Sequence, residues 1–275
     1  MKKQGFSLGM VAGLVLMPVL LLAGCTVSAQ SHGGDFPFGT KGEPQGPGIV
    51  LNRLSGGDES LSGSGRVVSE TFNIRGFSKI EVSHAFRVDI VQGDSYRVLV
   101  RIDDNLEQHV RVEKRGDTLI IGLKPLRGYN LRRATMEAEV RMPDLTGIEV
   151  SGASDVKISG FTSNKNFDVK LSGASSLEGE ITTDDASIEA SGASQARLIG
   201  EANNLRLDAS GASNIDLEDF PVFDAEIELS GASEAEVVLN GTLDIDVSGA
   251  SRLYYGGNPT IRRIDLSGAS SIKRR

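Results

Sequence analysis

The side chains best suited to ion binding or acid–base catalysis form a column of carboxylates that returns about every 19 residues. Its members are Glu149, Lys170, Glu189, Asp208, Glu228, Asp246 and Asp265, acidic at six of seven positions. Carboxylate oxygens are the ligands that Ca²⁺ prefers, and clustered carboxylates also serve enzymes that cleave polysaccharides. The sequence therefore leaves open a weak cation-binding column at Glu189, Asp208, Glu228, Asp246 and Asp265, or a catalytic groove along the same face.

A solvated charged face is the simpler interpretation of this column. Like charges about 4.8 Å apart repel by about 1 kcal/mol in water before screening. Arg206 and Arg263, two positions upstream of column members, can relieve that repulsion. A second column runs through Lys157, Glu178, Arg197, Asp216 and Glu236 and alternates in sign over its first four coils, which suits cross-strand ion pairs. Because an active site breaks periodicity and these columns keep it, we favour a protein that is not an enzyme.

Other chemistry-bearing residues are sparse. The chain has one Cys, three His, four Tyr and no Trp among 275 residues. A cysteine-built zinc site, an internal disulfide and a histidine-based triad are therefore disfavoured, and His84 has no second His or Cys at ligand spacing. The adjacent Tyr254 and Tyr255 are the one candidate surface aromatic contact. We expect no cofactor, with Ca²⁺ as the weak alternative.

The overall charge excludes one class of partner. Acidic residues outnumber basic ones by 37 to 29, which gives a net charge of −8 at pH 7. Nucleic-acid binding needs a basic surface that displaces counterions from phosphates. We therefore expect no nucleic-acid partner.

The first 24 residues predict a leader for export. Lys2 and Lys3 precede an apolar run of about 16 residues, shorter than the roughly 20 that a transmembrane helix needs. The run closes on Leu22-Ala23-Gly24-Cys25, which resembles the bacterial lipobox. By that resemblance Cys25 is lipidated and becomes the first residue of the mature protein. We expect a lipid-anchored envelope protein, at the outer rather than the inner membrane because Thr26 is not an aspartate. A plain signal peptide is the alternative.

Residues 25–65 predict a tether. Residues 26–65 contain ten glycines and three prolines without a sustained apolar period, so they cannot bury enough surface to order themselves. A flexible coil of about 40 residues spans about 35 Å. The folded head is therefore expected to occupy residues 66–275.

The head is defined by an internal repeat. Ser-Gly-Ala-Ser occurs seven times, starting at Ser151, Ser172, Ser191, Ser210, Ser230, Ser248 and Ser267. Apolar residues three positions and one position before each first Ser flank a polar one, which is the two-residue period of a half-buried strand. Short strands that recur every 18 to 21 residues, without an intervening helix, match the coils of a parallel β-helix. The predicted fold class is all-β, a parallel β-helix (solenoid).

The tetrapeptide is expected to form the corner of each coil, because glycine adopts backbone conformations that other residues avoid. If the alternation runs unbroken through the corner, Gly152 and Ser154 face inward and Ser151 and Ala153 face outward. The inner serines would then form a ladder of hydrogen-bonded hydroxyls. The outer strip of small side chains is flat enough to receive another surface, including a second copy of the chain.

One more coil is hidden upstream. Residues 80–90 align with residues 148–158, with His84 in place of the glycine and Phe86 in place of the second serine. A terminal coil has to close the core against water, and a bulky Phe suits that role. With this coil the repeat predicts about eight coils.

Residues 91–147 interrupt the repeat as an excursion, before residues 148–275 carry the tetrapeptides. Alternation predicts strands over residues 96–102 and 136–142, a hairpin over 110–123, and one or two helical turns over 103–109. We expect these strands to pair with the first coils and cover the open edge. At the far end three basic residues, 273–275, are expected to substitute for a cap.

Several segments together resemble a known family. They are Lys79-Ile80-Glu81-Val82-Ser83, Val88-Asp89-Ile90-Val91-Gln92-Gly93-Asp94, Asp103-Asp104-Asn105-Leu106 and the tetrapeptide series. Over about residues 68–275 the chain resembles the bacterial autotransporter adhesin head (GIN) domain. The resemblance implies a β-helical fold on secreted or lipid-anchored proteins and brings no established activity.

These observations predict a non-enzymatic binding, adhesin-like or envelope-structural module. Its partners would be the membrane, through the lipid anchor, and a polysaccharide or an envelope protein. A carbohydrate-active enzyme that acts on an envelope or extracellular polysaccharide is the alternative. A self-assembling homo-oligomer is a third hypothesis.

Overall fold

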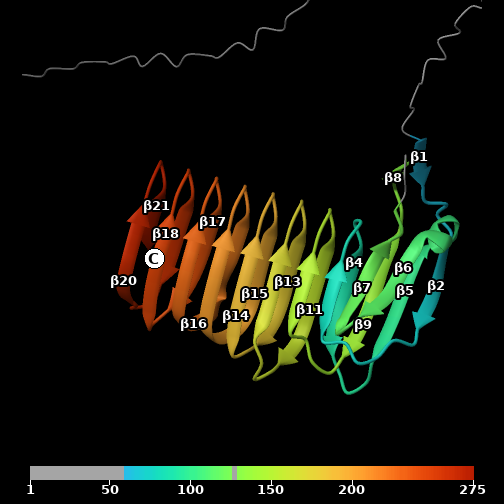
Figure 1. Ribbon diagram of the computed structural model, residues 1–275, viewed down its shortest axis with the longest axis horizontal. Helices are drawn as coiled ribbons and strands as arrows, with labels where there is room; N and C mark the ends of the chain where they lie inside the picture. Colours follow the sequence, from blue (N-terminus) through green and yellow to red (C-terminus); the bar gives the residue numbers. More distant parts are fainter. Residues whose placement is uncertain (1–58, 126–128) are drawn as a thin grey trace, which may run out of the picture. The chain divides into compact units, whose positions relative to one another are not determined.

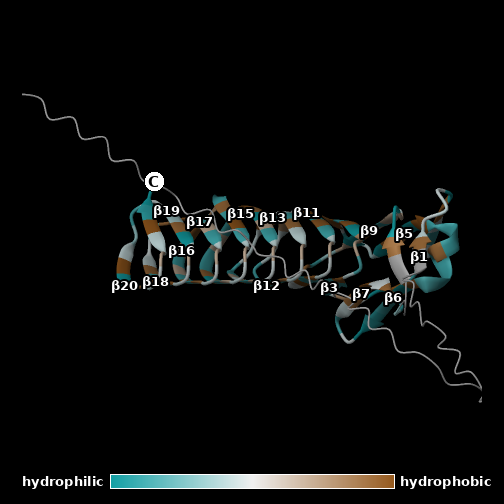
Figure 2. Cartoon of the chain, turned by 90° about the horizontal axis from the view of Figure 1, so that it is seen from above, coloured by the Kyte–Doolittle hydropathy of each residue, from teal (hydrophilic) through white to brown (hydrophobic). Residues whose placement is uncertain are grey.

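The computed structural model describes residues 59–125 and 129–275. The leader 1–24, Cys25 and most of the tether 25–65 lie outside the described residues. The described chain is 64% strand and 3% helix, and it contains no helix that is both long and apolar enough to span a membrane. Two walls of parallel strands face each other and wind into a solenoid (Figure 1, Figure 2). The predicted parallel β-helix is confirmed.

Each coil contributes one strand to each wall. We call the strands before the corners sheet I: β3 (Lys79–Val82), β10 (Gly147–Val150), β12 (Phe167–Leu171), β14 (Asp185–Ala190), the second halves of β15 (Gln195–Ala209) and β16 (Asn214–Leu229), β18 (Thr242–Val247) and β20 (Thr260–Leu266). Sheet II follows the corners: β4 (Arg87–Gln92), β11 (Asp155–Thr162), β13 (Ser176–Thr182), the first halves of β15 and β16, β17 (Glu234–Leu239), β19 (Arg252–Gly256) and β21 (Ser271–Arg274).

Equivalent positions of successive coils are paired in register. Ile148 pairs with Val169, and the same column continues without a slip to Ile264. The hidden coil joins the stack as expected, because Ile80 pairs with Ile148 and the following strand β4 pairs with β11. The inward apolar side chains form one continuous core from Phe77 to Leu253. Full burial of each aliphatic side chain stabilises the fold by about 1.5 to 3 kcal/mol.

The solenoid has about seven turns, slightly fewer than the eight expected. Eight corners are present, one in the hidden coil and seven from the tetrapeptide. A complete turn runs from one corner to the next, so eight corners enclose seven turns. After the last corner the described chain has only β21, which does not return to sheet I.

The corner glycines are required for two reasons. Their φ angles lie between 72° and 78°, which is the left-handed region that disfavours other residues. The corners also stack closely: the Ala193 amide donates to the Gly173 carbonyl of the preceding coil at 2.7 Å. A Cβ on Gly173 would lie 2.5 Å from the carbonyl oxygen of Gly152. No larger residue fits without moving the backbone.

This geometry corrects the expected orientation of the corner. Ser154 is buried and Ala153 is exposed, as expected, but Gly152 is exposed rather than inward. The expectation for Gly152 was wrong because its positive φ interrupts the strand alternation.

The buried serines of the described corners form the expected contact between hydroxyls of successive coils only once, between Ser175 and Ser194 at 3.5 Å; most of their other hydroxyl bonds are local. The Ser194 hydroxyl donates to the Ser191 carbonyl three residues earlier, at 2.7 Å, and Ser213 bonds Ser210 in the same way at 2.8 Å. The turn brings this carbonyl within reach of the hydroxyl, so the local bond forms without help from the next coil.

The excursion caps the N-terminal end much as expected. Its elements are β5 (Arg97–Asp103), the 3₁₀ helix η1 (Asp104–His109), the hairpin strands β6 (Val110–Arg115) and β7 (Thr118–Leu123), and β9 (Met136–Met142). Strand β7 pairs with β3, and β9 pairs with β4. Strand β2 (Val67–Phe72) adds an outer antiparallel layer on β5.

A parallel pair was not anticipated. Strand β1 (Glu59–Ser62), which falls within the segment expected to be tether, pairs with β8 (Tyr129–Arg132). The buried Asp103 carboxylate fixes this region by accepting from the amides of Gly65 and Thr135 at 2.8 and 2.7 Å.

Asp104 and Asn105, which follow Asp103 in the segment Asp103-Asp104-Asn105-Leu106, complete this attachment. The Asn105 side chain bonds the Ser64 amide and the Ser62 carbonyl, while Asp104 bonds the Ser64 hydroxyl and Arg66. We call Asp103, Asp104, Asn105 and the residues 62–66 that they hold the clasp. The segment Asp103-Asp104-Asn105-Leu106, one of those on which the family resemblance was based, therefore has a structural role.

The C-terminal end is built differently. Ile264 and Leu266 occupy inward columns in β20 and are exposed, whereas Ile245 and Val247, one coil earlier, are buried. The three basic residues do not cover them: Arg275 pairs with Glu236, and Arg274 donates to the Gly257 carbonyl. The expected charged substitute for a cap was wrong in this respect, because these side chains bond back onto the preceding coils.

Candidate functional site

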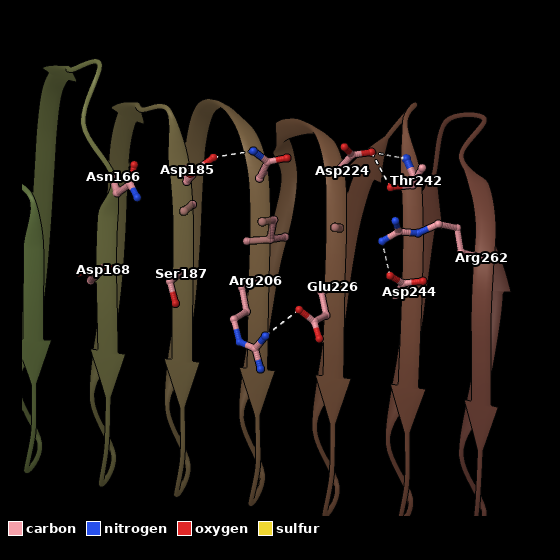
Figure 3. Close-up of a pocket in the computed structure, with 14 residues that line it drawn as sticks. Asn166, Asp168, Asp185, Ser187, Arg206, Asp224, Glu226, Thr242, Asp244 and Arg262 are labelled. Atoms are coloured by element: carbon pink, nitrogen blue, oxygen red, sulfur yellow. Dashed lines mark hydrogen bonds and ion pairs between the residues drawn. The ribbon is translucent and has the colours of Figure 1, made fainter.

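A shallow groove crosses the outer face of sheet I (Figure 3). It has a volume of about 390 Å³ and runs over the strands from β12 to β18, with Arg262 at its end. Two columns line it. The upper one consists of Asn166, Asp185, Asn204, Asp224 and Thr242, and the lower one of Asp168, Ser187, Arg206, Glu226 and Asp244. The groove is polar, and each coil from β12 to β18 contributes one residue to each column.

Hydrogen bonds between coils hold the upper column in place. The Asn204 amide donates to Asp185 Oδ1 at 2.6 Å. The Thr242 hydroxyl and backbone amide both donate to Asp224 Oδ1, at 2.7 and 2.5 Å. These two bonds hold the pKa of Asp224 below its ordinary value of 3.8, the hydroxyl bond contributing most. Asp224 therefore stays ionised at neutral pH and keeps its acceptor oxygens.

Ion pairs order the lower column. Arg206 bonds Glu226 at 2.6 Å and reaches Glu228 at 3.5 Å. Arg262 pairs with Asp244 of the preceding coil. The groove therefore presents guanidinium donors beside carboxylate, hydroxyl and amide groups.

The predicted acidic column lies beside this groove and is stacked in register as expected. Basic side chains reach four of its five candidate cation ligands: Lys170 bonds Glu189 at 3.1 Å, Arg206 reaches Glu228, and Arg263 lies 3.6 Å from Asp246 and 3.5 Å from Asp265. The bond to Glu189 raises the pKa of Lys170 above 10.5.

These ion pairs support the interpretation as a solvated charged face. Within residues 59–125 and 129–275, no three or more His, Cys, Asp or Glu side chains are grouped so that they could hold a metal ion. Cation binding by Glu189, Asp208, Glu228, Asp246 and Asp265 stays a prediction.

The two candidate tyrosines lie on sheet II, away from the groove. Tyr254 stands in the sign-alternating column between Glu236 and Lys273, with the Arg275 guanidinium 4.6 Å from its ring centre. Tyr255 packs against the core. Tyr254 is thus already occupied by a cation–π contact.

A second pocket was not anticipated from the sequence. It has a volume of about 510 Å³ and lies where the excursion meets the first corner. Its lining residues are His84, Ala85, Leu123, Leu131, Arg133, Ala134, Met136 and Ala153. The signal that could have located it is the one corner whose tetrapeptide is replaced, at residues 83–86.

Comparisons with known proteins agree with this architecture. The family described as "Putative auto-transporter adhesin, head GIN domain" matches residues 76–259. No curated protein matches the sequence.

Three solved structures share the fold. A "putative adhesin" from Bacteroides fragilis NCTC 9343 superposes with a TM-score of 0.73 at 21% identity, over 78% of this chain and 100% of that one. A "putative lipid binding protein" from Parabacteroides distasonis ATCC 8503 gives 0.61 at 21%, over 79% and 100%. A "putative adhesin" from Parabacteroides merdae ATCC 43184 gives 0.58 at 17%, over 79% and 99%.

At such identities the three structures establish the fold alone. The family match covers most of the described solenoid, including the hidden coil, the excursion and six of the seven tetrapeptides. The chain therefore belongs to the auto-transporter adhesin head domain (GIN) family.

Proposed function

We propose that the protein is a non-enzymatic, adhesin-like binding module that presents the outer face of sheet I to a polar polymer of the cell envelope or its surroundings. The observation that carries this proposal is the groove of Figure 3, to which successive coils each contribute polar side chains at the same two register positions. Stacked strands repeat about every 4.8 Å, so an extended polymer meets a polar group at regular intervals along its length. A small ligand would not need such repetition.

The chemistry of the groove favours a polysaccharide. Asn204 and Thr242 offer amide and hydroxyl groups, while Asp224 offers acceptors for sugar hydroxyls. Arg206 and Arg262 can bind carboxylate or sulfate substituents in a bidentate manner. Each contact with an exposed groove is weak, and several in a row add up through multivalency.

Periodicity supports a binding role over catalysis. An enzyme would need convergent carboxylates that interrupt the repeat, whereas Asp185, Asp224 and Glu226 belong to repeating columns that are already bonded to their neighbours. The names of two solved relatives, both "putative adhesin", agree with this proposal. Turnover of any member of a polysaccharide panel would contradict it.

We further propose that the module is anchored through a lipid on Cys25, at the outer membrane. The support is the order of basic residues, apolar run and Leu22-Ala23-Gly24-Cys25 in the sequence. Two or three acyl chains hold a protein stably on a bilayer, which one does not. Cys25→Ala should abolish incorporation of labelled palmitate and release the protein from membranes, and unchanged labelling and fractionation would contradict the anchor.

A binding screen with matched variants tests the polymer proposal. The full chain is screened against glycans and envelope proteins with and without Ca²⁺, and the best ligand is then offered to two charge reversals. Arg206→Glu lies in the groove, and Arg197→Glu lies on sheet II with almost the same side-chain exposure, 57% against 56%. We expect at least tenfold weaker binding for Arg206→Glu alone. Equal effects of both variants would show that the groove is not the binding face.

A further inference from the structure

The pocket at the first corner is where the described chain adopts its most unfavourable backbone. Only three residues other than glycine have a positive φ in the described chain: His84 at 66°, Ala85 at 62° and Arg133 at 48°. All three line this one pocket. Such conformations are disfavoured for L-residues and tend to persist where they serve a ligand site.

The corner itself does not require this strain. The seven later corners place glycine at the position of His84, where a positive φ carries no steric penalty. Those corners also have no positive φ at the alanine that corresponds to Ala85. The first corner therefore keeps a histidine where the repeat has an easier solution.

The body of the pocket is apolar. Six of its eight lining residues are Ala, Leu or Met, and its volume of about 510 Å³ lies within the roughly 300 to 1,000 Å³ of small-molecule sites. Leu123 and Met136 belong to the hydrophobic core and line the pocket with only a small part of their surface, being 3% and 5% exposed; the alanines and Leu131 complete the apolar lining. Ala153, from the corner of the next coil, also lines the pocket.

Two polar groups stand at the same pocket. His84 Nδ1 lies 2.7 Å from the Ser83 hydroxyl and accepts from the Leu123 amide at 3.5 Å. With Nδ1 accepting, Nε2 carries the proton and is a donor. Arg133 adds a permanent positive charge, and no described carboxylate lies within ion-pair distance of it.

We propose that this pocket binds an amphiphile with one carboxylate head and an unbranched acyl chain of medium length. Arg133 and His84 Nε2 bind the carboxylate, and the chain lies against Leu123, Met136 and Ala153. Guanidinium and carboxylate pair in a bidentate manner, and the apolar wall stabilises the chain through burial. This site is separate from the groove on sheet I and does not depend on the polymer proposal.

The first experiment compares three probes by calorimetry. The chain is produced from residue 26, so that neither the leader nor an acyl group of its own competes. We expect sodium decanoate to bind at one site per chain, 1-decanol to bind at least tenfold more weakly, and sodium acetate to show no saturation. Absence of saturable decanoate binding, or acetate binding as strong as that of decanoate, would overturn the proposal.

Matched variants locate the site. Ala153→Phe fills the pocket, while Ala174→Phe places the same side chain at the equivalent exposed position of the next corner, outside the pocket. We expect at least tenfold weaker decanoate binding for Ala153→Phe and no change for Ala174→Phe. Equal effects of the two would contradict the assignment.

The head-group contact is tested separately. Arg133→Gln should remove most of the preference for decanoate over 1-decanol, with the remainder due to His84, and should leave the binding of 1-decanol unchanged; Arg133→Lys should restore part of the preference. Circular dichroism melting checks that each variant is folded, and Arg133→Gln decides the question should Ala153→Phe fail to fold. An unchanged preference for decanoate over 1-decanol in Arg133→Gln would refute the role of Arg133. Polymer binding should be the same in all of these variants.

Discussion

The strands at the two ends of the solenoid have the same pattern of inward apolar residues, but these residues are buried at one end and exposed at the other. At the N-terminal end Ile80 and Val82 are 1% and 0% exposed, while Ile264 and Leu266, which occupy the same inward columns in β20, are 51% and 48% exposed. At the N-terminal end, strand β7 of the excursion pairs with β3 and covers it. No described element covers β20 from the other side. The repeat thus specifies register, whereas closure of an end needs sequence outside the repeat.

The polar groups of the two ends differ as well. The clasp ties residues 62–66 to η1 through the carboxylates of Asp103 and Asp104 and the amide of Asn105. At the other end single ion pairs such as Arg275–Glu236 connect the last coil to its predecessors. The clasp contains a buried carboxylate with two backbone donors, which is a stronger attachment than an exposed ion pair.

The largest effect is expected for a corner glycine in the middle of the stack. In Gly211→Val the new Cβ would collide with the Gly192 carbonyl, and the backbone has a φ of +74°. The conformational and packing penalties together should lower the free energy of unfolding by about 3 kcal/mol or more. Urea unfolding followed by circular dichroism measures this.

Gly268→Val in the last corner is the control for position. Its Cβ would meet the Gly249 carbonyl in the same way, but the last coil can move outward, so the global loss should be smaller. An unchanged melting temperature in Gly211→Val would refute the corner assignment.

Two isoleucines of one column test burial directly. Ile245→Ala should lower the free energy of unfolding by about 2 to 4 kcal/mol, because Ile245 is fully buried and its truncation leaves a cavity. Ile264→Ala, one coil later in the same column, should lower it by less than about 1 kcal/mol. Equal losses in the two variants would mean that another surface covers the last coil in solution.

The clasp should show an intermediate and local effect. Asp103→Ala leaves the amides of Gly65 and Thr135 without their acceptor, at a cost of about 1 to 3 kcal/mol for unsatisfied buried donors. Hydrogen exchange should become faster in β1 and β8 and stay unchanged in β14. Faster exchange throughout the solenoid would show instead that the clasp supports the whole core.

The smallest effects concern pH and have opposite signs at the two ends. The Ser64 hydroxyl and Arg66 lower the pKa of Asp104 below 3.8, so its stabilisation is present above pH 3.8 and is lost as the pH falls through the lowered pKa. Burial raises the pKa of Glu236 above 4.5 despite Arg275. Protonation of Glu236 in the folded state therefore adds stability as the pH falls through that raised pKa towards 4.5.

Urea midpoints of two variants across this range check the signs. Asp104→Asn should be less stable than the unsubstituted chain at pH 7, and this difference in stability should disappear under strong acid. The stability of the unsubstituted chain relative to Glu236→Gln should rise on mild acidification. Parallel pH profiles for both variants would contradict the assigned shifts.

The sequence predicted what the repeat encodes and missed what depends on contacts outside it. The inward columns, the hidden coil and the strands of the excursion follow from two-residue alternation, which is local. The orientation of Gly152 was wrong because alternation carries no information about a positive φ. The clasp joins Asp103 to Thr135, 32 residues later, and the corner pocket assembles four separate segments of chain around His84 and Arg133. The sequence signal of the pocket was only the departure from the tetrapeptide at residues 83–86.

Hydrogen exchange resolved along the whole chain tests the contrast between the ends most directly. We predict slow exchange in the solenoid strands from β3 to β18, with protection falling sharply in β20 and β21. Protection of β20 and β21 equal to that of β14 would contradict this prediction.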